Sequence, residues 1–413
     1  MTYRGRATSR RASPRPVSLR ATVHPVPGCC TQPPTRRARV ITFGLLSTYP
    51  PTLCGLASFT ASLRAALPPG SAGGVVRAVE SAAPTGGPEV VGDLVAGSPA
   101  SCRAAATLLD RDDVAIVQHE YGIYGGPDGE DVLRVLELLR VPAIVVLHTV
   151  LSAPTQHQRT VLNGVLAAAA AIVVMSETAR ARLVAGYDVP AGRLVVIPHG
   201  APDNGGPAAA PHHSQHRQIL TWGLLGPGKG IEWGIEAMAL LPAQWPEPRY
   251  LVAGRTHPKV QAQQGESYRR ALMLRTERLG VRDRVRFDAR YLAAASLRRL
   301  VARAEVVLLP YDSRDQVTSG VLIEAVTART PVVATRFPHA VELLSGGAGL
   351  LVDHRDPAAI AEALQKILTD RAAAGRMAAA AGIAARSLGW ASVAAQYSRL
   401  GAELVSARPR VVA

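Results

Sequence analysis

The chain has 413 residues, 48 % of them hydrophobic and 19 % charged, so it can build two domains of medium size and is no small scaffold. Its longest apolar run, residues 165–175, is shorter than the roughly 20 residues that a transmembrane helix needs. Four cysteines, two of them adjacent, form neither a disulfide framework nor a zinc pattern, which favours a reducing compartment. We therefore expect a cytoplasmic protein.

The formal charge of +15 is concentrated at the N-terminus. Residues 1–39 hold nine Arg and six Pro but no acidic residue, so they supply nine of the fifteen excess charges. A segment of this composition has no apolar surface to bury, and the sequence predicts a disordered tail. A solvated extension is the plain interpretation, and peripheral contact with an anionic membrane is the alternative. No specific nucleic-acid partner is expected, because most of the excess charge belongs to the tail.

From residue 39 onward, short β-branched runs alternate with longer Ala- and Leu-rich segments, which is typical of parallel sheets with crossover helices. A helix is expected over 57–67, after a loop that contains Pro and Gly. The strands expected in the first block are 40–45, 114–118, 143–147, 171–175 and 194–197. Those expected in the second block are 219–222, 250–253, 285–288, 306–309 and 331–334, before a last helix at 390–405.

The sequence thus predicts an α/β protein of two Rossmann-like domains that face each other across a cleft. The expected parts are a tail at 1–39, an N-terminal domain at 40–203, a linker at 204–216, a C-terminal domain at 217–388, and a closing helix and tail at 389–413. The linker contains His212, His213 and His216, but no acidic residue or Cys lies nearby to complete a metal site. A solvated loop is therefore favoured there.

A glycine-rich turn follows the strand that ends at Trp222. Its glycines, Gly228 among them, allow a backbone to approach a ligand closely, and Lys229 adds a compact positive charge. The spacing is not that of a P-loop, because no Ser or Thr follows the lysine. An exposed lysine in a tight turn is the plain alternative. Only three of the 46 basic residues are lysines, which favours a phosphate contact for this one.

A polar loop over 311–319 leads into a second candidate site. The helix predicted to begin near Ser319 and Gly320 could present free N–H groups to an anion. Glu324 lies further along this otherwise apolar helix, and a carboxylate in such a place needs a partner. That partner is either an arginine or the hydroxyl groups of a ligand.

The N-terminal domain offers further polar residues at strand ends. His119, Glu120 and Tyr121 follow one strand directly, and His148 ends the next. Acceptor binding and ordinary loop or core packing both explain the first three. The acidic run 110–113 resembles a metal-binding DxD motif, but it precedes its strand and so lies at the end away from ligands. No metal is therefore expected.

Several segments together resemble the GT-B glycosyltransferases of glycosyltransferase family 4, over roughly residues 40–405. The resemblance is carried by residues 50–55, Ser176, 196–200, 223–230 and 310–334. It implies a retaining hexosyltransferase (EC 2.4 class) that moves a sugar from a nucleoside diphosphate sugar to an acceptor hydroxyl, without a metal or cofactor. The acceptor would be a carbohydrate, a lipid or a small molecule.

The resemblance also implies roles for individual residues. The family motif is a Glu, seven residues and a second Glu that binds the ribose; the second position is Glu324, and the first, which holds sugar hydroxyls, is Gln316. His148 would face the donor sugar, and with Lys229 and Gln316 it forms the expected catalytic set.

The remaining roles concern the diphosphate and the acceptor. The groups expected to bind the donor phosphates are Gly55, Gly228, Lys229, Ser319 and Gly320. The groups expected to bind the acceptor are His119, Glu120 and Tyr121. The family's usual Arg in the glycine-rich turn is Leu224 here, and its first motif Glu is Gln316. A catalytically altered or inactive protein, a phosphorylase or epimerase of the same shape, and a basic nucleic-acid-binding protein are the alternatives.

Overall fold

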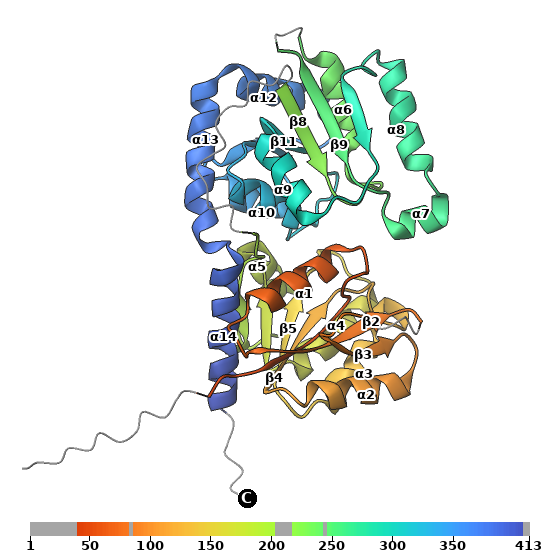
Figure 1. Ribbon diagram of the computed structural model, residues 1–413, viewed down its shortest axis with the longest axis vertical. Helices are drawn as coiled ribbons and strands as arrows, with labels where there is room; N and C mark the ends of the chain where they lie inside the picture. The colour runs from red at the N-terminus through yellow and green to blue at the C-terminus, as the bar shows by residue number, and fades with distance from the viewer. Residues whose placement is uncertain (1–38, 82–85, 203–216, 243–245, 408–413) are drawn as a thin grey trace, which may run out of the picture. The chain divides into compact units, whose positions relative to one another are not determined.

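The computed structural model describes residues 39–81, 86–202, 217–242 and 246–407 (Figure 1). The expected tail lies outside the described residues except for residue 39. The whole of the expected linker, with its three histidines, lies outside them as well. The chain divides into a unit Met1–Arg39 and a unit Val40–Ala413.

The N-terminal domain is built on a parallel sheet. Within the described residues it has seven strands in the order β3-β2-β1-β4-β5-β6-β7. The strands are β1 (Phe43–Ser47), β2 (Ala72–Val79), β3 (Val90–Val95), β4 (Val114–His119), β5 (Ala143–Leu147), β6 (Ala171–Val174) and β7 (Leu194–Val196). The helical segments are α1 (Gly55–Ala66), α2 (Pro99–Leu109), η1 (Pro127–Gly129), α3 (Asp131–Leu138), α4 (Gln156–Ala168), α5 (Glu177–Gly186) and η2 (Ala191–Arg193).

The C-terminal domain repeats this plan. Its parallel sheet has six described strands in the order β10-β9-β8-β11-β12-β13. They are β8 (Arg217–Trp222), β9 (Pro248–Ala253), β10 (Val285–Asp288), β11 (Val306–Leu309), β12 (Val332–Thr335) and β13 (Gly349–Val352). The helical segments are α6 (Ile231–Leu240), α7 (Pro258–Gln264), α8 (Ser267–Arg278), α9 (Ala294–Arg303), α10 (Gly320–Thr327), α11 (Pro338–Leu344), α12 (Pro357–Thr369), α13 (Arg371–Ala384) and η3 (Ala385–Ser387).

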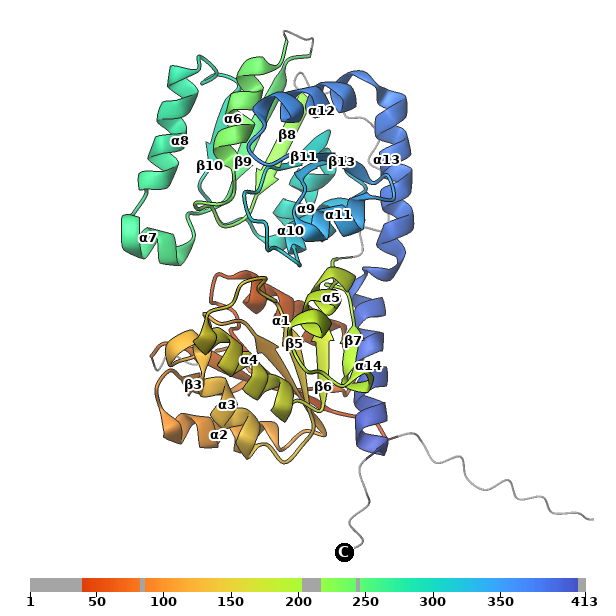
Figure 2. The same cartoon turned by 180° about the vertical axis from the view of Figure 1, so that it is seen from behind.

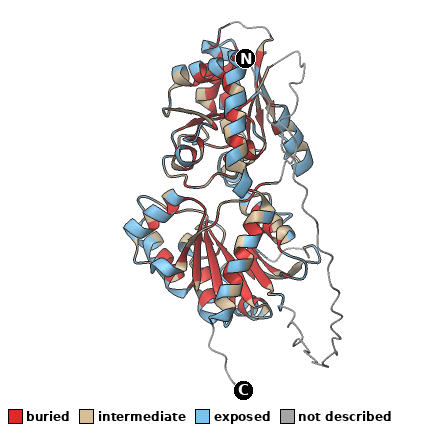
Figure 3. Ribbon diagram, turned by 90° about the vertical axis from the view of Figure 1, so that its left-hand side faces the viewer, coloured by how far each residue is buried: buried red, intermediate tan, exposed pale blue. Residues whose placement is uncertain are grey.

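Strands β1, β4, β5 and β6 of the first sheet and β11 and β12 of the second are buried along their whole length (Figure 3). Helices cover both faces of a parallel sheet, so these strands are nearly continuous Val, Ile and Leu runs. This explains why the sequence located them. The apolar run 165–175 holds two elements, because α4 ends at Ala168 and β6 begins at Ala171. No helix among the described residues is long and apolar enough to cross a membrane.

Three strands, β2, β3 and β13, were missed by the sequence analysis. Strands β2 and β13 contain glycine, and β3 carries Asp93, so none shows the expected apolar run. The charge on β3 is explained by its neighbour: Arg77 on β2 donates from Nε to Asp93 Oδ1 at 2.9 Å and is only 3 % exposed. A paired charge can be buried where a lone one cannot.

The last helix, α14 (Trp390–Ser406), returns to the N-terminal domain (Figure 2). Its apolar face, which includes Tyr397, packs against Phe43 of β1 and Phe59 of α1. Where the chain passes between the domains, Ala201 pairs with Gly389: Ala201 N donates to Leu388 O at 2.8 Å, and Trp390 N to Ala201 O at 3.1 Å. The two crossing points therefore lie side by side.

Candidate functional site

The glycine-rich turn after β8 is joined to the loop after β11. Gly230 has a φ of 62°, and a Cβ at this position would collide with the carbonyl oxygen of Pro310, so only glycine fits. Asp312 N donates to Gly228 O at 2.9 Å. Two segments singled out separately in the sequence thus form one surface at the carboxyl ends of adjacent strands, where α/β sheets bind ligands.

Lys229 is held over an aromatic ring. Its Nζ lies 4.3 Å from the centroid of Tyr311, which is 1 % exposed and stacks on Phe337. The lysine is half-buried and not fully exposed as the plain alternative supposed. An ammonium group above a ring face is attracted by the ring electrons, which favours this position of the Lys229 side chain. Tyr311 is not recognisable from the sequence as its partner.

The start of α10 is fixed by two side chains. Ser319 Oγ accepts from Leu322 N at 3.3 Å, and Ser319 N donates to His339 Nδ1 at 2.9 Å. The next N–H groups, beginning at Gly320, belong to the first turn and have no carbonyl one turn earlier in the helix to bind. The positive end of the helix dipole lies at this turn. Gly223 of the glycine turn approaches this helix, since a Cβ there would lie 3.7 Å from Val321 Cγ2.

Glu324 has the partner that its position requires. The Trp222 side chain hydrogen-bonds to this carboxylate, and Arg298 adds a favourable charge. Burial still outweighs both and raises the pKa of Glu324 to about 7. Neither partner was identified from the sequence. At neutral pH the carboxyl group is therefore poised between its two forms, and a ligand that donates hydrogen bonds would favour the ionised one.

Gln316 is held within its own loop. Its side-chain Nε2 donates to Thr318 O at 3.1 Å, and its backbone carbonyl oxygen accepts from the backbone N of His339, in α11, at 3.3 Å. The same histidine accepts from Ser319 N, so one side chain and its backbone set the path from Gln316 to the start of α10. The contact expected between Gln316 and sugar hydroxyls stays a prediction.

His148 lies against an aromatic cluster formed by Phe59, His199 and Trp390. Its ring is 5.0 Å from Phe59 edge-on, and His199 is 4.9 Å from the same ring. His148 Nε2 donates to Gln118 Oε1 at 2.7 Å. Burial lowers the pKa of His148 to about 3 and that of His199 to about 4, so both are neutral at pH 7.

His199 connects this cluster to α10. A Cβ on Gly320 would lie 3.0 Å from His199 Nε2, and the other ring nitrogen, Nδ1, donates to Gly200 O at 2.6 Å. The structure thus brings His148 and the start of α10 to the same neighbourhood through His199 and Phe59. His199 lies in one of the segments that carry the family resemblance, but no role was predicted for it. The only feature of the sequence that could have pointed to a functional His199 is its place directly before a glycine.

The three residues expected to bind the acceptor lie together, with one of them inside the protein. His119 is 1 % exposed and packs edge-on against Tyr121 at 5.1 Å. Glu120 accepts from Thr149 Oγ1 at 2.5 Å and from Tyr121 N at 3.0 Å, and burial raises its pKa. A residue as buried as His119 supports its neighbours and does not itself face solvent. Contact of Glu120 and Tyr121 with an acceptor stays a prediction.

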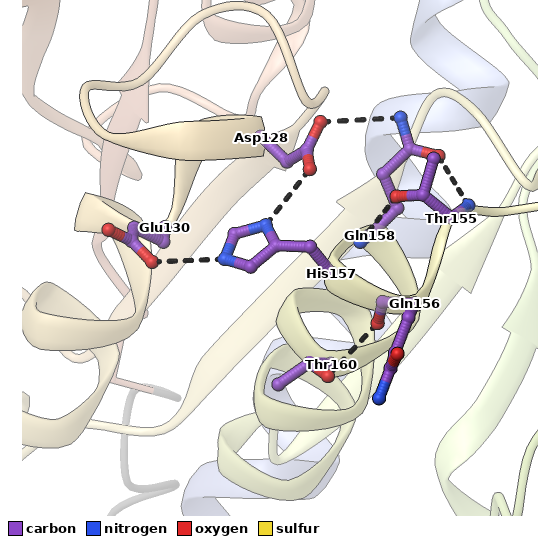
Figure 4. Close-up of polar contacts among 7 residues, drawn as sticks. All are labelled: Asp128, Glu130, Thr155, Gln156, His157, Gln158 and Thr160. Carbon is purple, nitrogen blue, oxygen red and sulfur yellow. Dashed lines mark hydrogen bonds and ion pairs between the residues drawn. The ribbon is translucent and has the colours of Figure 1, made fainter.

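The loop that follows Tyr121 is fastened to α4 by an exposed histidine (Figure 4). His157 Nδ1 lies 2.9 Å from Asp128 Oδ2, and its Nε2 lies 3.3 Å from Glu130 Oε2. Both ring nitrogens face carboxylates, so both must carry a proton, and these partners raise the pKa of His157. Thr155 and Gln158 cap α4 reciprocally beside them.

Gly55 lies at the start of α1, and its expected contact with the donor phosphates stays a prediction. Gly55 is exposed at the first turn of α1, and a Cβ there would meet no atom within 4 Å, so space does not require glycine. Asp113 accepts from Thr42 N at 3.0 Å, and Asp110 accepts from Arg140 N at 2.8 Å. These carboxylates hold backbone at the amino end of β4. No cluster of three His, Cys, Asp or Glu in the described part of the chain is arranged to hold a metal.

Comparisons with known families match both halves of the chain. Residues 69–204 match the model described as Glycosyltransferase Family 4, and residues 216–370 match Glycosyl transferases group 1. Two curated relatives are D-inositol 3-phosphate glycosyltransferases from Corynebacterium efficiens and Corynebacterium glutamicum, each 34 % identical, over 197 and 190 residues. These alignments cover 46 % and 45 % of this chain. They span 44 % and 43 % of the relatives, less than half of either.

Solved structures share the fold at low identity. Anabaena HepE in complex with UDP and glucose has a TM-score of 0.69 at 18 % identity, covering 88 % of this chain and all of that one. Sucrose-phosphate synthase from Thermosynechococcus elongatus has a TM-score of 0.66 at 19 % identity, covering 89 % of this chain and all of that one. Two Rossmann-like domains, each matching its own family model in order, identify the chain as a member of the GT-B glycosyltransferases of family 4.

Proposed function

We propose that the protein is a retaining hexosyltransferase that moves a sugar from a nucleoside diphosphate donor to an acceptor hydroxyl without a metal ion. The observation that carries this proposal is the grouping of Lys229, the first turn of α10 and Glu324 around the glycine turn after β8. Lysine and helix N–H groups suit a diphosphate, and a carboxylate suits ribose hydroxyls.

In the proposed reaction, the bond between the anomeric carbon and the diphosphate oxygen breaks, and its electron pair leaves with the phosphate. Lys229 and the N–H groups at Gly320 stabilise the charge that develops there, which is the main source of the rate. The acceptor oxygen bonds to the anomeric carbon on the same face. Its proton passes to the departing phosphate oxygen, so no second carboxylate is needed, and Gln316 is free to hold sugar hydroxyls as a neutral amide.

The acceptor is proposed to bind at Glu120 and Tyr121, beside His148. Its class is a carbohydrate, a lipid or a small molecule. D-inositol 3-phosphate belongs in the first panel, since the names of the curated relatives contain it. UDP-glucose belongs among the first donors, because HepE was crystallised with it. For the Arg-rich tail we propose a solvated extension, with membrane contact as the alternative.

The test is a thermal-shift screen of nucleotide sugars and nucleoside diphosphates, followed by product analysis. A donor that binds the folded protein raises its unfolding temperature by mass action. With that donor and an acceptor panel, proton NMR of the product reports whether the anomeric configuration is retained. An inverted product would contradict the retaining mechanism, and absence of any stabilising nucleotide would contradict the proposed function. Transfer that collapses in excess chelator and returns with Mg²⁺ or Mn²⁺ would contradict metal independence.

A further inference from the structure

We propose that Arg182 of α5 is a positioning residue that joins the loop carrying His148 to the loop carrying Gln316, and so sets the distance between the two sides of the reaction site. This inference rests on the proposed function for its catalytic meaning. Its structural part stands on contacts of the free protein.

The guanidinium group of Arg182 reaches both loops at once. Its Nη1 donates to Val150 O at 3.2 Å, two residues beyond His148. The same nitrogen donates to Asp315 O at 3.1 Å and to Asp315 Oδ1 at 3.2 Å, and Nη2 donates to Arg314 O at 3.3 Å. Three of the four acceptors are backbone carbonyls, so the contact fixes the path of the chain itself.

The His148 loop is otherwise held from its own domain, whereas the Gln316 loop is held from both domains, because Val317 is buried in the same hydrophobic cluster as Val150. His148 is bound by Gln118 and its N–H by His119 O, while the second loop is bound by Gly228 at Asp312 and by His339 at Gln316. Arg182 adds a bond from one domain to the other immediately before Gln316. The Arg182 side chain is 20 % exposed and that of Asp315 45 %, so water screens the ion pair and its share of global stability is small.

Such a bridge acts on rate through geometry. In a transferase the reacting atoms must approach within a narrow range, and a displacement of about 1 Å can cost on the order of 100-fold in rate. The bond to Arg314 O is the one made by Nη2, while the other three are made by Nη1. Arg182→Gln removes the charge and most of the donors. Arg180 provides a matched control, since it lies on the same helix and pairs only with exposed Glu177 among the contacts that the structure records for it.

The first measurement is amide hydrogen exchange of the full-length protein without ligand. Arg182→Gln should exchange at least about tenfold faster than wild type in peptides over 148–152 and 312–318. Arg180→Gln should exchange as wild type does. The unfolding temperature of all variants should stay within about 2 °C of wild type. Unchanged exchange in Arg182→Gln at a normal unfolding temperature would overturn the bridge.

The second measurement separates positioning from binding. With a donor found by the screen, Arg182→Gln should lower kcat by at least about tenfold while the Kd for the donor's nucleoside diphosphate stays within about twofold. Equal losses in kcat and affinity, or an unfolding temperature lower by many degrees, would mean a general structural role and overturn the proposal. If wild type transfers no sugar, the proposed function fails, and the exchange result alone decides whether Arg182 joins the loops.

Discussion

Lys229 shows how a single side chain can be prepared for a ligand before the ligand arrives. The Tyr311 ring beneath its ammonium group limits the rotamers that it samples, so less entropy is lost when an anion binds. The turn that carries it is fixed by Gly230 against Pro310. The position of the Lys229 charge and the path of its turn are thus both set by one other segment, the loop that begins at Pro310 and Tyr311.

Replacing Lys229 with Ala should weaken nucleoside diphosphate binding by tenfold or more, since a charge-assisted hydrogen bond contributes about 1.5–3 kcal/mol. The unfolding temperature should not fall, because the turn is shaped by its glycines. Calorimetric titration with UDP, or with whichever nucleotide the screen selects, measures the effect. Lys366→Ala, on the exposed face of α12, is the control. Equal affinities for wild type and Lys229→Ala would remove the lysine from the site.

Glu324 should make nucleotide binding depend on pH. Its folded-state pKa of about 7 means that the carboxyl is mostly neutral at pH 6 and mostly ionised at pH 8. If the ionised form accepts the ribose hydroxyls, affinity should rise about tenfold between these values. Glu324→Gln should show only the titration of the ligand itself, so the ratio of the two Kd values isolates the residue. A constant ratio across this range would contradict the ribose contact.

The raised pKa of Glu324 affects the stability of the free protein in the opposite direction, because stability falls as the pH rises. A carboxyl whose pKa is raised by folding stabilises the free protein below its ordinary pKa, and this contribution is lost as the pH rises through about 7. Glu324→Gln should therefore raise the free energy of unfolding at pH 8, by an amount on the order of 1–3 kcal/mol. Urea unfolding at pH 5 and pH 8 measures it. A variant less stable than wild type at pH 8 would show that Trp222 and Arg298 outweigh burial.

At the scale of elements, two sets of hydrogen bonds join α5 to the C-terminal domain. Glu342 of α11 accepts from Glu177 N at 2.8 Å and from Thr178 N at 2.9 Å, which are N–H groups of the first turn of α5. One turn on, Arg182 holds Asp315. A carboxylate at a helix N-terminus is favoured by the dipole, so this contact complements the arginine bridge.

The loop after β4 should loosen as the pH rises. Only the charged form of His157 can donate to both carboxylates at once, so its raised pKa means that both contacts persist below the ordinary value of 6.5 and one of them is lost above the raised value. Hydrogen exchange over 126–131, corrected for the intrinsic rate, should speed up between pH 6 and pH 8.5. His157→Gln should be loose at both values, and Gln156→Ala should behave as wild type. Identical profiles for wild type and His157→Gln would refute this switch.

The elements that sequence patterns located are those whose residues carry their own signal. Strand β4 begins with four Val, Ala and Ile residues and is buried throughout. Strands β2 and β3 could not be found this way, because Arg77 is tolerated only opposite Asp93, and that pairing exists only after folding. The site follows the same rule. Glycines and Lys229 are visible in the sequence, whereas Tyr311 and Arg182 become relevant only through contacts with distant segments.

At the scale of the whole molecule, the change in amino-acid composition and the boundary between the two units both fall at residue 39. Residues 1–39 form a unit apart from Val40–Ala413, and no site residue lies in the first unit. A protein lacking residues 1–38 should therefore keep its unfolding temperature and its transfer rate on acceptors in solution. A lower rate with dissolved acceptors would show that the tail takes part in the reaction. A lower rate only with acceptors in anionic vesicles would support membrane contact.

The adjacent crossing points at Ala201 and Gly389 give the chain a nested architecture. Because α14 packs on the sheet that β1 begins, the C-terminal domain is an insertion within the N-terminal one. The points where the chain enters and leaves the C-terminal domain are joined by two backbone hydrogen bonds, so the inserted segment 202–388 begins and ends at the same place. If the proposed donor site lies in this segment, one transplant between related proteins would exchange donor preference and leave the proposed acceptor site whole, whereas a chimera with a single junction would separate α14 from the core it completes.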